Sequence, residues 1–300
     1  METPYHKSVL LSQSVQGLNI QPDGVYVDVT FGGGGHSREI LKHLGANGKL
    51  FAFDQDKDAA SHAPNDERFT LIQENFRHLK RFLRFYGITQ VDGVLGDFGV
   101  SSHQFDSPER GFSTRFDANL DMRMNQSHHT SARQILNQYQ EAELSQILFR
   151  YADLKNARSL AKAIVQARQE KAIHTNADLQ KALHKFLPKG KENKVLAQIF
   201  QAIRIEVNDE ISALEEFLWQ LPEVVKTGGR ISLISYHSLE DRLVKRFIRD
   251  GKFQGEAQKD FYGNPLVPFR KVGGLITPSP EEIQQNNRAR SAKLRIAQRI

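Results

Sequence analysis

The 300-residue sequence contains no cysteine. This absence excludes disulfide bonds, thiolate metal sites and cysteine nucleophiles together. No apolar run approaches the ~20 residues that a membrane-spanning helix requires. The N-terminal string METPYHKSVLLSQS also lacks the hydrophobic region of a signal peptide. These absences predict a cytoplasmic protein with no membrane partner.

The composition is that of an ordinary globular chain, with 39% apolar and 25% charged residues. Its length allows one large domain or two smaller ones. The formal net charge is +6 and the isoelectric point is about 9.4. This positive balance favours a polyanionic partner without identifying one.

Residues 24–37, GVYVDVTFGGGGHS, are typical of a strand, a glycine loop and the start of a helix. Val25, Val27 and Val29 alternate with other side chains, and four consecutive glycines follow. Such a loop presents a nucleotide-like ligand at the carboxyl end of a first strand. Alone, it is compatible with a methyltransferase, with another nucleotide-binding fold or with a structural turn.

The residues around the loop disfavour a dinucleotide. Ser37 stands where the dinucleotide fingerprint requires its third glycine. A carboxylate at Asp28 would repel a pyrophosphate, but it would attract the sulfonium and ammonium groups of S-adenosylmethionine. The acid-and-glycine pattern of methyltransferases is present with one replacement, as Asp28, Thr30, Gly32 and Gly34. A methyltransferase is therefore favoured over a dinucleotide oxidoreductase.

Three further strands are predicted over residues 48–56, 69–76 and 91–102, with helical patterns between them. Repeated β-α units predict an α/β fold with a doubly wound, mostly parallel sheet. Asp54 follows the second strand about 20 residues past the glycines, where such folds hydrogen-bond a ribose. Asp97 ends the fourth strand.

From about residue 131 to residue 207 the apolar pattern is helical throughout. Strand patterns return at 230–238 and 291–298, and the intervening polar segment 251–274 is predicted to be partly mobile. We therefore predict a methyltransferase domain formed by residues 1–107 and 208–300. Residues 108–207 form an inserted all-helical domain that binds the substrate.

Asp97 lies where amine-directed methyltransferases place their chemistry. The exocyclic amine of a base is a poor nucleophile because its lone pair is conjugated with the ring. Acceptors that hold the amine hydrogens free that lone pair for in-line attack on the sulfonium methyl group. Asp97 has the chemistry of such an acceptor, although an aspartate at a strand end is equally typical of a cap or a turn.

Two groups of cations indicate an RNA partner. Arg110, Arg115 and Arg123 alternate with Phe112 and Phe116, which combines charge with stacking surfaces for a flipped base. The C-terminal segment from Ile283 has no acidic side chain. It carries five cations, Arg288, Arg290, Lys293, Arg295 and Arg299. These suit RNA phosphates, and they equally suit a solvated edge strand protected by charge.

Other catalytic classes lack their motifs. No G-x-S-x-G sequence surrounds the Ser-His pairs at 102–103 and 237–238, so a serine hydrolase is not predicted. His128 and His129 have no accompanying metal-binding motif, so no metal site is predicted.

Several strings together resemble the RsmH (MraW) family of ribosomal small-subunit RNA cytosine-N4 methyltransferases. They extend in the family's order from His6 to Ala297: HKSVLL, DVTFGGGGHS, DFGVSSHQFD, ERGFS, LDMRM, FQAIRIEVNDE, GGRISLISYHSLEDRLVKRF and NNRARSAKLRIA. The sequence departs from the family pattern at a few positions, among them Tyr236, which replaces a phenylalanine, and in much of the helical insert.

The resemblance implies methyl transfer from S-adenosylmethionine to the N4 amine of a cytidine in the decoding region of small-subunit rRNA. Free rRNA, a precursor and the assembled subunit all remain open as the substrate, and the sequence predicts no oligomeric state. Carried over by position, the cofactor contacts are Gly34, Gly35, His36, Asp54, Phe76, Asp97 and Gln104. The RNA contacts that we expect are Phe98, Arg110, Phe112, Arg123 and His237, and Asp97 is the catalytic candidate.

Two alternatives stay open. The chain could methylate another amine in RNA, DNA or protein. It could also be a ribosome-assembly factor that keeps the cofactor pocket, although an intact glycine loop with Asp54 and Asp97 argues against loss of the cofactor.

Overall fold

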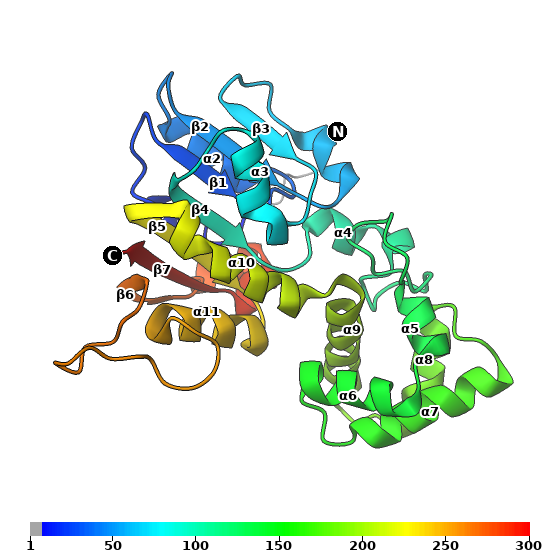
Figure 1. Cartoon of the computed structure of the whole chain (residues 1–300). Helices are drawn as coiled ribbons and strands as arrows, with labels where there is room; N and C mark the ends of the chain where they lie inside the picture. The colour runs from blue at the N-terminus through cyan, green and yellow to red at the C-terminus, as the bar shows by residue number, and fades with distance from the viewer. Residues whose placement is uncertain (1–7) are drawn as a thin grey trace. The chain divides into compact units, whose positions relative to one another are not determined.

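The computed structural model describes residues 8–300, which form two compact units (Figure 1). The first unit contains the residues up to Gly99 together with Ile211–Ile300, and the second contains Val100–Glu210. The sequence-based boundaries at 107/108 and 207/208 lie eight and three residues from these. His6 and Lys7, which open the string HKSVLL, lie outside the described residues.

The first unit is built on one seven-stranded sheet in the order β3-β2-β1-β4-β5-β7-β6. The strands are β1 (Val25–Asp28), β2 (Lys49–Phe53), β3 (Phe69–Ile72), β4 (Val91–Asp97), β5 (Val225–Ser235), β6 (Phe269–Ile276) and β7 (Lys293–Arg299). The five strands from β3 to β5 are parallel, whereas β7 is antiparallel to both β5 and β6. The predicted doubly wound, mostly parallel α/β fold is confirmed.

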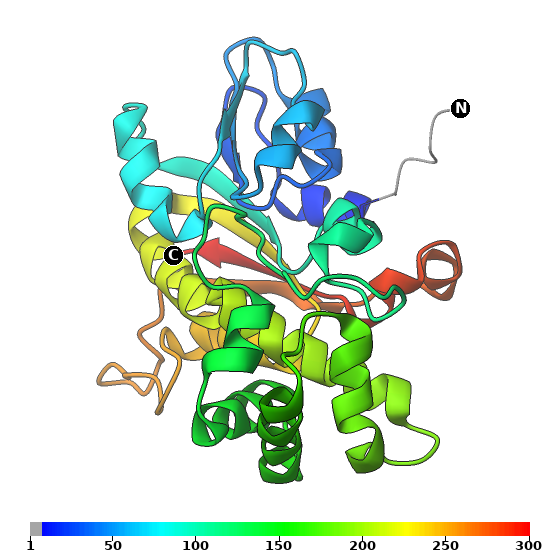
Figure 2. The ribbon, with the colours of Figure 1, turned by 90° about the vertical axis from the view of Figure 1, so that its right-hand side faces the viewer.

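Helices cover both faces of this sheet (Figures 1 and 2). Successive residues of a strand point to opposite faces, so Tyr26 and Val27 enter different cores. Tyr26 packs in the core that α1 (Leu11–Gly17) and α2 (Gly35–His43) cover. Val27 packs in the larger core under α3 (Leu79–Phe85), α10 (Glu210–Val224) and α11 (Ser238–Asp250). The shorter elements of this unit are η1 (Lys57–His62), η2 (Phe76–His78), α12 (Pro280–Gln285) and η5 (Asn287–Ser291).

The parallel strands bring their carboxyl ends to one edge of the sheet. In the register of β4 and β5, Asp97 is the partner of Ile234, and Asp28 of β1 is the partner of Leu95. The segments that follow β1, β2, β4 and β5 therefore meet at this edge. In open α/β sheets, ligands bind at this edge.

The C-terminal part differs from the sequence-based expectation in two ways. The polar segment 251–274, which we expected to be partly mobile, contains the first residues of β6. Gly273 and Gly274 interrupt the alternation that would have revealed this strand. The final strand β7 lies between β5 and β6, so the interpretation of its cations as protection of an edge strand is wrong.

The second unit is helical and has its own core. It contains α4 (Ser102–Asp106), η3 (Pro108–Arg110), α5 (Ala132–Gln138), α6 (Glu141–Ala152), α7 (Ala157–Glu170), α8 (Asn176–Leu183), η4 (His184–Phe186) and α9 (Glu192–Asn208). Ser131 and Thr175 cap α5 and α8 with reciprocal side-chain bonds to the third helical residue. Leu160, Leu179 and Ile199, taken from the three predicted stripes, are fully buried. Within residues 8–300, no helix is long and apolar enough to span a membrane.

Candidate active site

The loop between β1 and α2 turns on two glycines in the left-handed region, Gly32 (φ 53°) and Gly34 (φ 76°). A Cβ atom at Gly34 would lie 2.8 Å from the ring of Phe31, so both the backbone angle and the space favour glycine. A Cβ atom at Gly33 would meet nothing within 4 Å. Gly35 begins α2. The loop therefore exposes bare backbone at Gly33, where a ligand has room to approach.

Asp28, the last residue of β1, has no exposed surface. Its carboxylate accepts hydrogen bonds from Ser37 Oγ at 2.7 Å and from the Thr30 backbone N–H at 3.1 Å. Burial raises the pKa of this carboxyl group. Asp28 therefore ties the start of the glycine loop to α2, and its charge acts on the site through space rather than by contact.

Asp54 follows β2 and is partly exposed. Its Oδ2 accepts from the backbone N–H of Gly32 at 2.7 Å, and its Oδ1 accepts from that of Asp56 at 2.9 Å. Burial raises the pKa of Asp54 to about 6, and the nearby charges of Asp56 and Asp28 add to the rise. A carboxylate has about four acceptor positions, so about two remain for ligand hydroxyl groups.

Asp97 ends β4 beside the loop, and its side chain is 20% exposed. Its backbone N–H donates to Thr30 Oγ1 at 2.6 Å, and its Oδ1 accepts from the hydroxyl of Tyr236 at 2.8 Å. Its Oδ2 lies 3.9 Å from Nδ1 of His36. Burial raises the pKa of Asp97 to about 6; Asp28 and Glu240 contribute to the rise and His36 opposes it.

Tyr236 was not among the site residues expected from the sequence, where it was only a departure from the family pattern. It follows β5, the strand next to β4, and burial together with the charge of Asp97 raises its pKa well above the usual value, so the hydroxyl stays protonated and remains a donor. Its backbone N–H donates to Glu240 Oε2 at 2.9 Å. The signal was its position two residues past Ile234, the partner of Asp97 in the sheet.

His36 lies in the first turn of α2 and is 4% exposed. Its Nε2 is 3.1 Å from the carbonyl oxygen of Val9, and its Nδ1 faces Asp97. Both ring nitrogens therefore have neighbours within the protein, although Nδ1 is too far from Asp97 for a hydrogen bond.

Phe76, Phe98 and Phe217 form an aromatic cluster with ring centroids 5.4 to 5.9 Å apart. Phe76 keeps a partly exposed ring, as a stacking surface requires. Phe98 is 4% exposed and packs in the core of the sheet. The expectation that the target base stacks on Phe98 conflicts with this burial, because neither ring face is free.

The residues expected to touch RNA in the helical unit have structural contacts instead. Arg110 is 3% exposed, and its guanidinium donates to the carbonyls of Arg123 and Met124 at 3.0 and 3.1 Å. Phe112 is buried in the helical core. Arg123 donates to both carboxylate oxygens of Asp121, at 2.8 and 2.7 Å, and to two loop carbonyls. In this structure these residues hold the irregular loop together, which conflicts with their use as RNA contacts.

Two neighbours from the same alternating pattern remain exposed. Phe116 is 41% exposed, and Arg115 is exposed with its guanidinium 5.9 Å from the ring of Phe105. Gln104 caps α4 in a capping box with Ser101, with both bonds at 3.2 Å, and is 4% exposed. Gln104 belongs to the second unit.

His237 and the C-terminal cations are also engaged within the first unit. His237 caps α11, and its Nε2 lies 3.0 Å from Glu240 Oε1; an RNA contact there would compete with this role. Arg295 and Lys293 pair with Asp241 at 2.8 and 3.3 Å, whereas Arg290 is exposed. Two of the five expected phosphate-binding cations of this segment are therefore engaged by the carboxylate of one aspartate.

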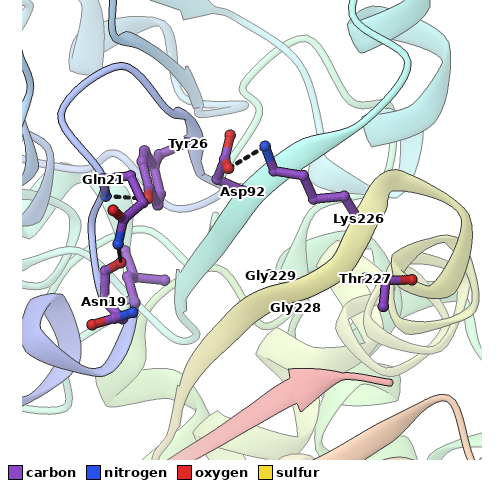
Figure 3. A pocket seen from close by; sticks show the side chains of 9 residues that line it. Asn19, Gln21, Tyr26, Asp92, Lys226, Thr227, Gly228 and Gly229 are labelled. Carbon is purple, nitrogen blue, oxygen red and sulfur yellow. Dashed lines mark hydrogen bonds and ion pairs between the residues drawn. The ribbon is translucent and has the colours of Figure 1, made fainter.

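A small polar pocket of about 180 Å³ lies at the opposite edge of the sheet, where β1, β4 and β5 begin (Figure 3). The backbone N–H of Gln21 donates to the hydroxyl of Tyr26 at 2.7 Å, and Lys226 pairs with Asp92. It is lined by Leu18, Asn19, Gln21, Tyr26, Asp92, Lys226, Thr227, Gly228 and Gly229. None of the expected site residues lines this pocket, so it is not the candidate active site.

Comparison with known proteins identifies the family. Residues 3–300 match the model of the MraW methylase family. This chain belongs to that family.

Three relatives named ribosomal RNA small subunit methyltransferase H match over nearly their whole length. The one from Christiangramia forsetii is 67% identical, and the match covers 99% of this chain and 98% of the relative's length. The one from Flavobacterium johnsoniae is 63% identical with the same coverage, and the one from Cytophaga hutchinsonii is 57% identical over 98% and 99%. The family resemblance found in the sequence is confirmed.

S-adenosylmethionine is the cofactor of this methylase. The carboxylates at the carboxyl edge of the sheet fit it, because Asp28 raises the pKa of both Asp54 and Asp97 by like-charge repulsion. A sulfonium and an ammonium would relieve this repulsion, whereas a pyrophosphate would increase it.

Proposed function

We propose that this methylase transfers a methyl group to the exocyclic N4 amine of one cytidine in the decoding region of small-subunit rRNA. The observation that carries the proposal is the Asp97 carboxylate, which accepts a hydrogen bond from Tyr236 and is partly exposed beside the glycine loop, while Thr30 holds the Asp97 backbone N–H. The names of the relatives support the ribosomal substrate.

The cofactor contacts that we propose in the first unit surround this carboxylate. The backbone of Gly34 and Gly35 lines the ligand, Asp54 accepts the ribose hydroxyls and Phe76 supports the adenine ring. Gln104 is the remaining cofactor contact that we propose. Bound S-adenosylmethionine supplies an electrophilic methyl group on a sulfonium.

Asp97 acts on the amine of the base. By accepting a hydrogen bond from the N4 amine, it draws the nitrogen lone pair out of conjugation and aims it at the methyl carbon. The N–C bond forms as the S–C bond breaks, the bonding pair of the latter stays on sulfur, and the surplus proton of the methylated amine leaves to water. The acceptor role requires an ionised Asp97, which a pKa of about 6 allows at neutral pH.

The helical unit, residues 108–207 in the sequence-based division, is proposed to bind the RNA. With Phe98 and Phe112 buried, Phe116 is the ring of this loop with a surface for stacking, and Arg115 is the cation beside it. Stacking on such a ring is how proteins hold unpaired bases.

Methyl transfer from labelled S-adenosylmethionine to small subunits that lack the modification tests the proposal. Label should appear as N4-methylcytidine at one site in base-resolved analysis, and Asp97→Ala should abolish it. Calorimetry with the cofactor separates loss of binding from loss of transfer.

Cofactor binding without incorporation into subunits, precursor or free rRNA would overturn the substrate assignment. Label on another amine would then identify a different acceptor. An absence of transfer to any acceptor would leave the assembly-factor alternative.

A further inference from the structure

The segment between α11 and β6 carries two of the most exposed aromatic side chains of the described chain. Phe261 is 97% exposed and Tyr262 is 85% exposed, and their ring centroids are 5.6 Å apart at an interplanar angle of 86°. Aromatic side chains normally bury most of their surface. Both views show this segment, in orange, extending away from the sheet (Figures 1 and 2).

Residues 258–266, which we call the aromatic finger, are folded as a hairpin. Lys259 and Pro265 form an antiparallel bridge, and the backbone N–H of Leu266 donates to the carbonyl of Gln258 at 2.7 Å. The carboxylate of Asp260 accepts from the backbone N–H groups of Tyr262 and Asn264 at 2.9 and 2.8 Å. The turn therefore holds both rings outward in a defined conformation.

The base of the finger is anchored in the first unit. Phe253 packs between Trp219 and Phe247, with ring centroids at 5.1 and 6.2 Å, and its carbonyl accepts from Arg246 at 2.7 Å. Phe269, the first residue of β6, is fully buried. Substitutions at the tip should therefore leave the fold intact.

The charges around the finger favour a polyanion. Residues 252–271 contain four cations, Lys252, Lys259, Arg270 and Lys271, against Glu256 and Asp260. Asp260 is occupied by the turn, and Lys259, Arg270 and Lys271 are exposed and have no ion pair within residues 8–300. Exposed rings interleaved with unpaired cations are typical of surfaces that bind single-stranded RNA.

A protein partner that adds a strand to the edge fits less well. β6 is the edge strand, but it breaks register with β7 between Val272 and Ile276 and exposes Arg270 and Lys271. Bulges and edge cations are features that oppose strand addition.

The finger lies far from the methyl-transfer site along the sheet. β6 runs in the same direction as β4, because both β5 and β6 are antiparallel to β7 and β5 is parallel to β4. The start of β6 is therefore at the amino edge, opposite to Asp97. A contact made there acts on substrate binding and not on the chemical step.

We propose that the aromatic finger is a second RNA contact, in which Phe261 and Tyr262 stack on unpaired bases of the small-subunit rRNA while Lys259, Arg270 and Lys271 neutralise its phosphates. This inference rests on the proposed function and adds to it a remote anchoring site.

Steady-state methylation and filter binding with small subunits and with protein-free small-subunit rRNA test it. Each of Phe261→Ala and Tyr262→Ala should raise KM and Kd about five-fold or more, with kcat within two-fold of wild type. Phe261→Trp should retain affinity, whereas Phe261→Leu, which keeps an apolar surface but no ring, should not. Phe85→Ala, which removes an exposed ring from α3, is the matched control and should change neither constant.

Arg270→Ala should lower the slope of log Kd against log salt by about one. Lys49→Ala, an exposed cation at the start of β2, should leave the slope unchanged. Unchanged calorimetric binding of S-adenosylmethionine verifies that each variant is folded.

Four results would overturn the inference. One is an unchanged KM for the tip variants. Another is an effect on assembled subunits but not on protein-free rRNA, which would mean that the finger contacts a ribosomal protein. A third is a difference in sedimentation between the wild-type chain and the tip variants in the absence of RNA, which would mean that the finger makes a contact between two copies of the chain. Finally, a wild-type chain that does not methylate these substrates would overturn the proposed function and this inference with it. If the wild-type chain is active and the tip variants are unaffected, the inference alone is overturned.

Discussion

The hydroxyl of Tyr236 donates a hydrogen bond of 2.8 Å to Oδ1 of Asp97, and it joins the ends of two neighbouring parallel strands. The hydroxyl lowers the pKa of a carboxyl group that burial raises to about 6. It also occupies one carboxylate oxygen, which leaves Oδ2 facing His36 and any ligand. The resemblance found in the sequence implies a phenylalanine here in the family, so we expect the bond to be an addition to the common site.

Tyr236→Phe should move the acid limb of the kcat profile to higher pH. Loss of a hydrogen bond to a charged group, about 1.5 kcal/mol, raises the pKa of Asp97 by about one unit. Activity at pH 6.5 should fall several-fold, while activity at pH 8.5 stays within two-fold of wild type. The profile is measured at saturating S-adenosylmethionine, so that titration of Asp54 does not affect cofactor occupancy. Tyr86→Phe, at a half-exposed tyrosine that follows α3, is the control. An acid limb that does not move would contradict the role.

Asp97→Asn should stabilise the free protein while removing its activity. A folded-state pKa raised from 3.8 to about 6 means that the folded state binds more protons than the unfolded state between those values. The contribution of this group to stability is therefore present below pH 4 and is lost as pH rises through 6, at a cost on the order of 2 to 3 kcal/mol. Denaturant unfolding should show Asp97→Asn above wild type at pH 8 and near it at pH 4, and kcat should fall about 100-fold or more.

The sheet was predictable because its signals are local. Alternating valines, the four glycines and the acids after β2 and β4 each identify a strand end, and parallel pairing then places Asp54 and Asp97 at one edge. β6 escaped prediction because Gly273 and Gly274 break its pattern and because its partner, β7, lies about 20 residues away across the α12 segment.

The burial and the internal bonds of the expected RNA contacts were not predictable, for a different reason. An arginine beside a phenylalanine predicts charge and stacking, but the pattern does not say whether the pair faces solvent. Arg110 and Arg123 donate their hydrogen bonds to loop carbonyls and to Asp121, because a long irregular loop has many backbone groups that need partners. Tyr236 was missed because its partner Asp97 is 139 residues away.

Substitutions at two adjacent glycines should separate an effect on folding stability from an effect on cofactor binding. Gly34→Ala should lower the free energy of unfolding by about 1 to 3 kcal/mol, because its φ of 76° is unfavourable for alanine and the Cβ would press on Phe31. Gly33→Ala should leave stability within about 0.5 kcal/mol, since the new methyl group meets no atom of the protein. That methyl group should nonetheless weaken binding of S-adenosylmethionine, measured by calorimetry. Unchanged affinity in Gly33→Ala would mean that the cofactor does not approach this face of the loop.

The sequence pattern suggested the same RNA-binding role for Arg123 and Arg115, but substitutions at these two residues should have different effects. Arg123→Ala removes a bidentate pair with Asp121 and two bonds to loop carbonyls, so it should destabilise the protein by about 1 to 3 kcal/mol. Arg115→Ala should leave the unfolding transition unchanged, because this side chain is exposed.

In binding to small subunits, Arg115→Ala should reduce the slope of log Kd against log salt by about one, whereas Arg123→Ala should leave the slope unchanged. The reverse pattern, with a stable Arg123→Ala that loses salt dependence, would restore Arg123 as a phosphate contact. Measuring unfolding and salt titration on the same preparations distinguishes the two, because a residue that only organises the loop changes stability without changing the number of ions released.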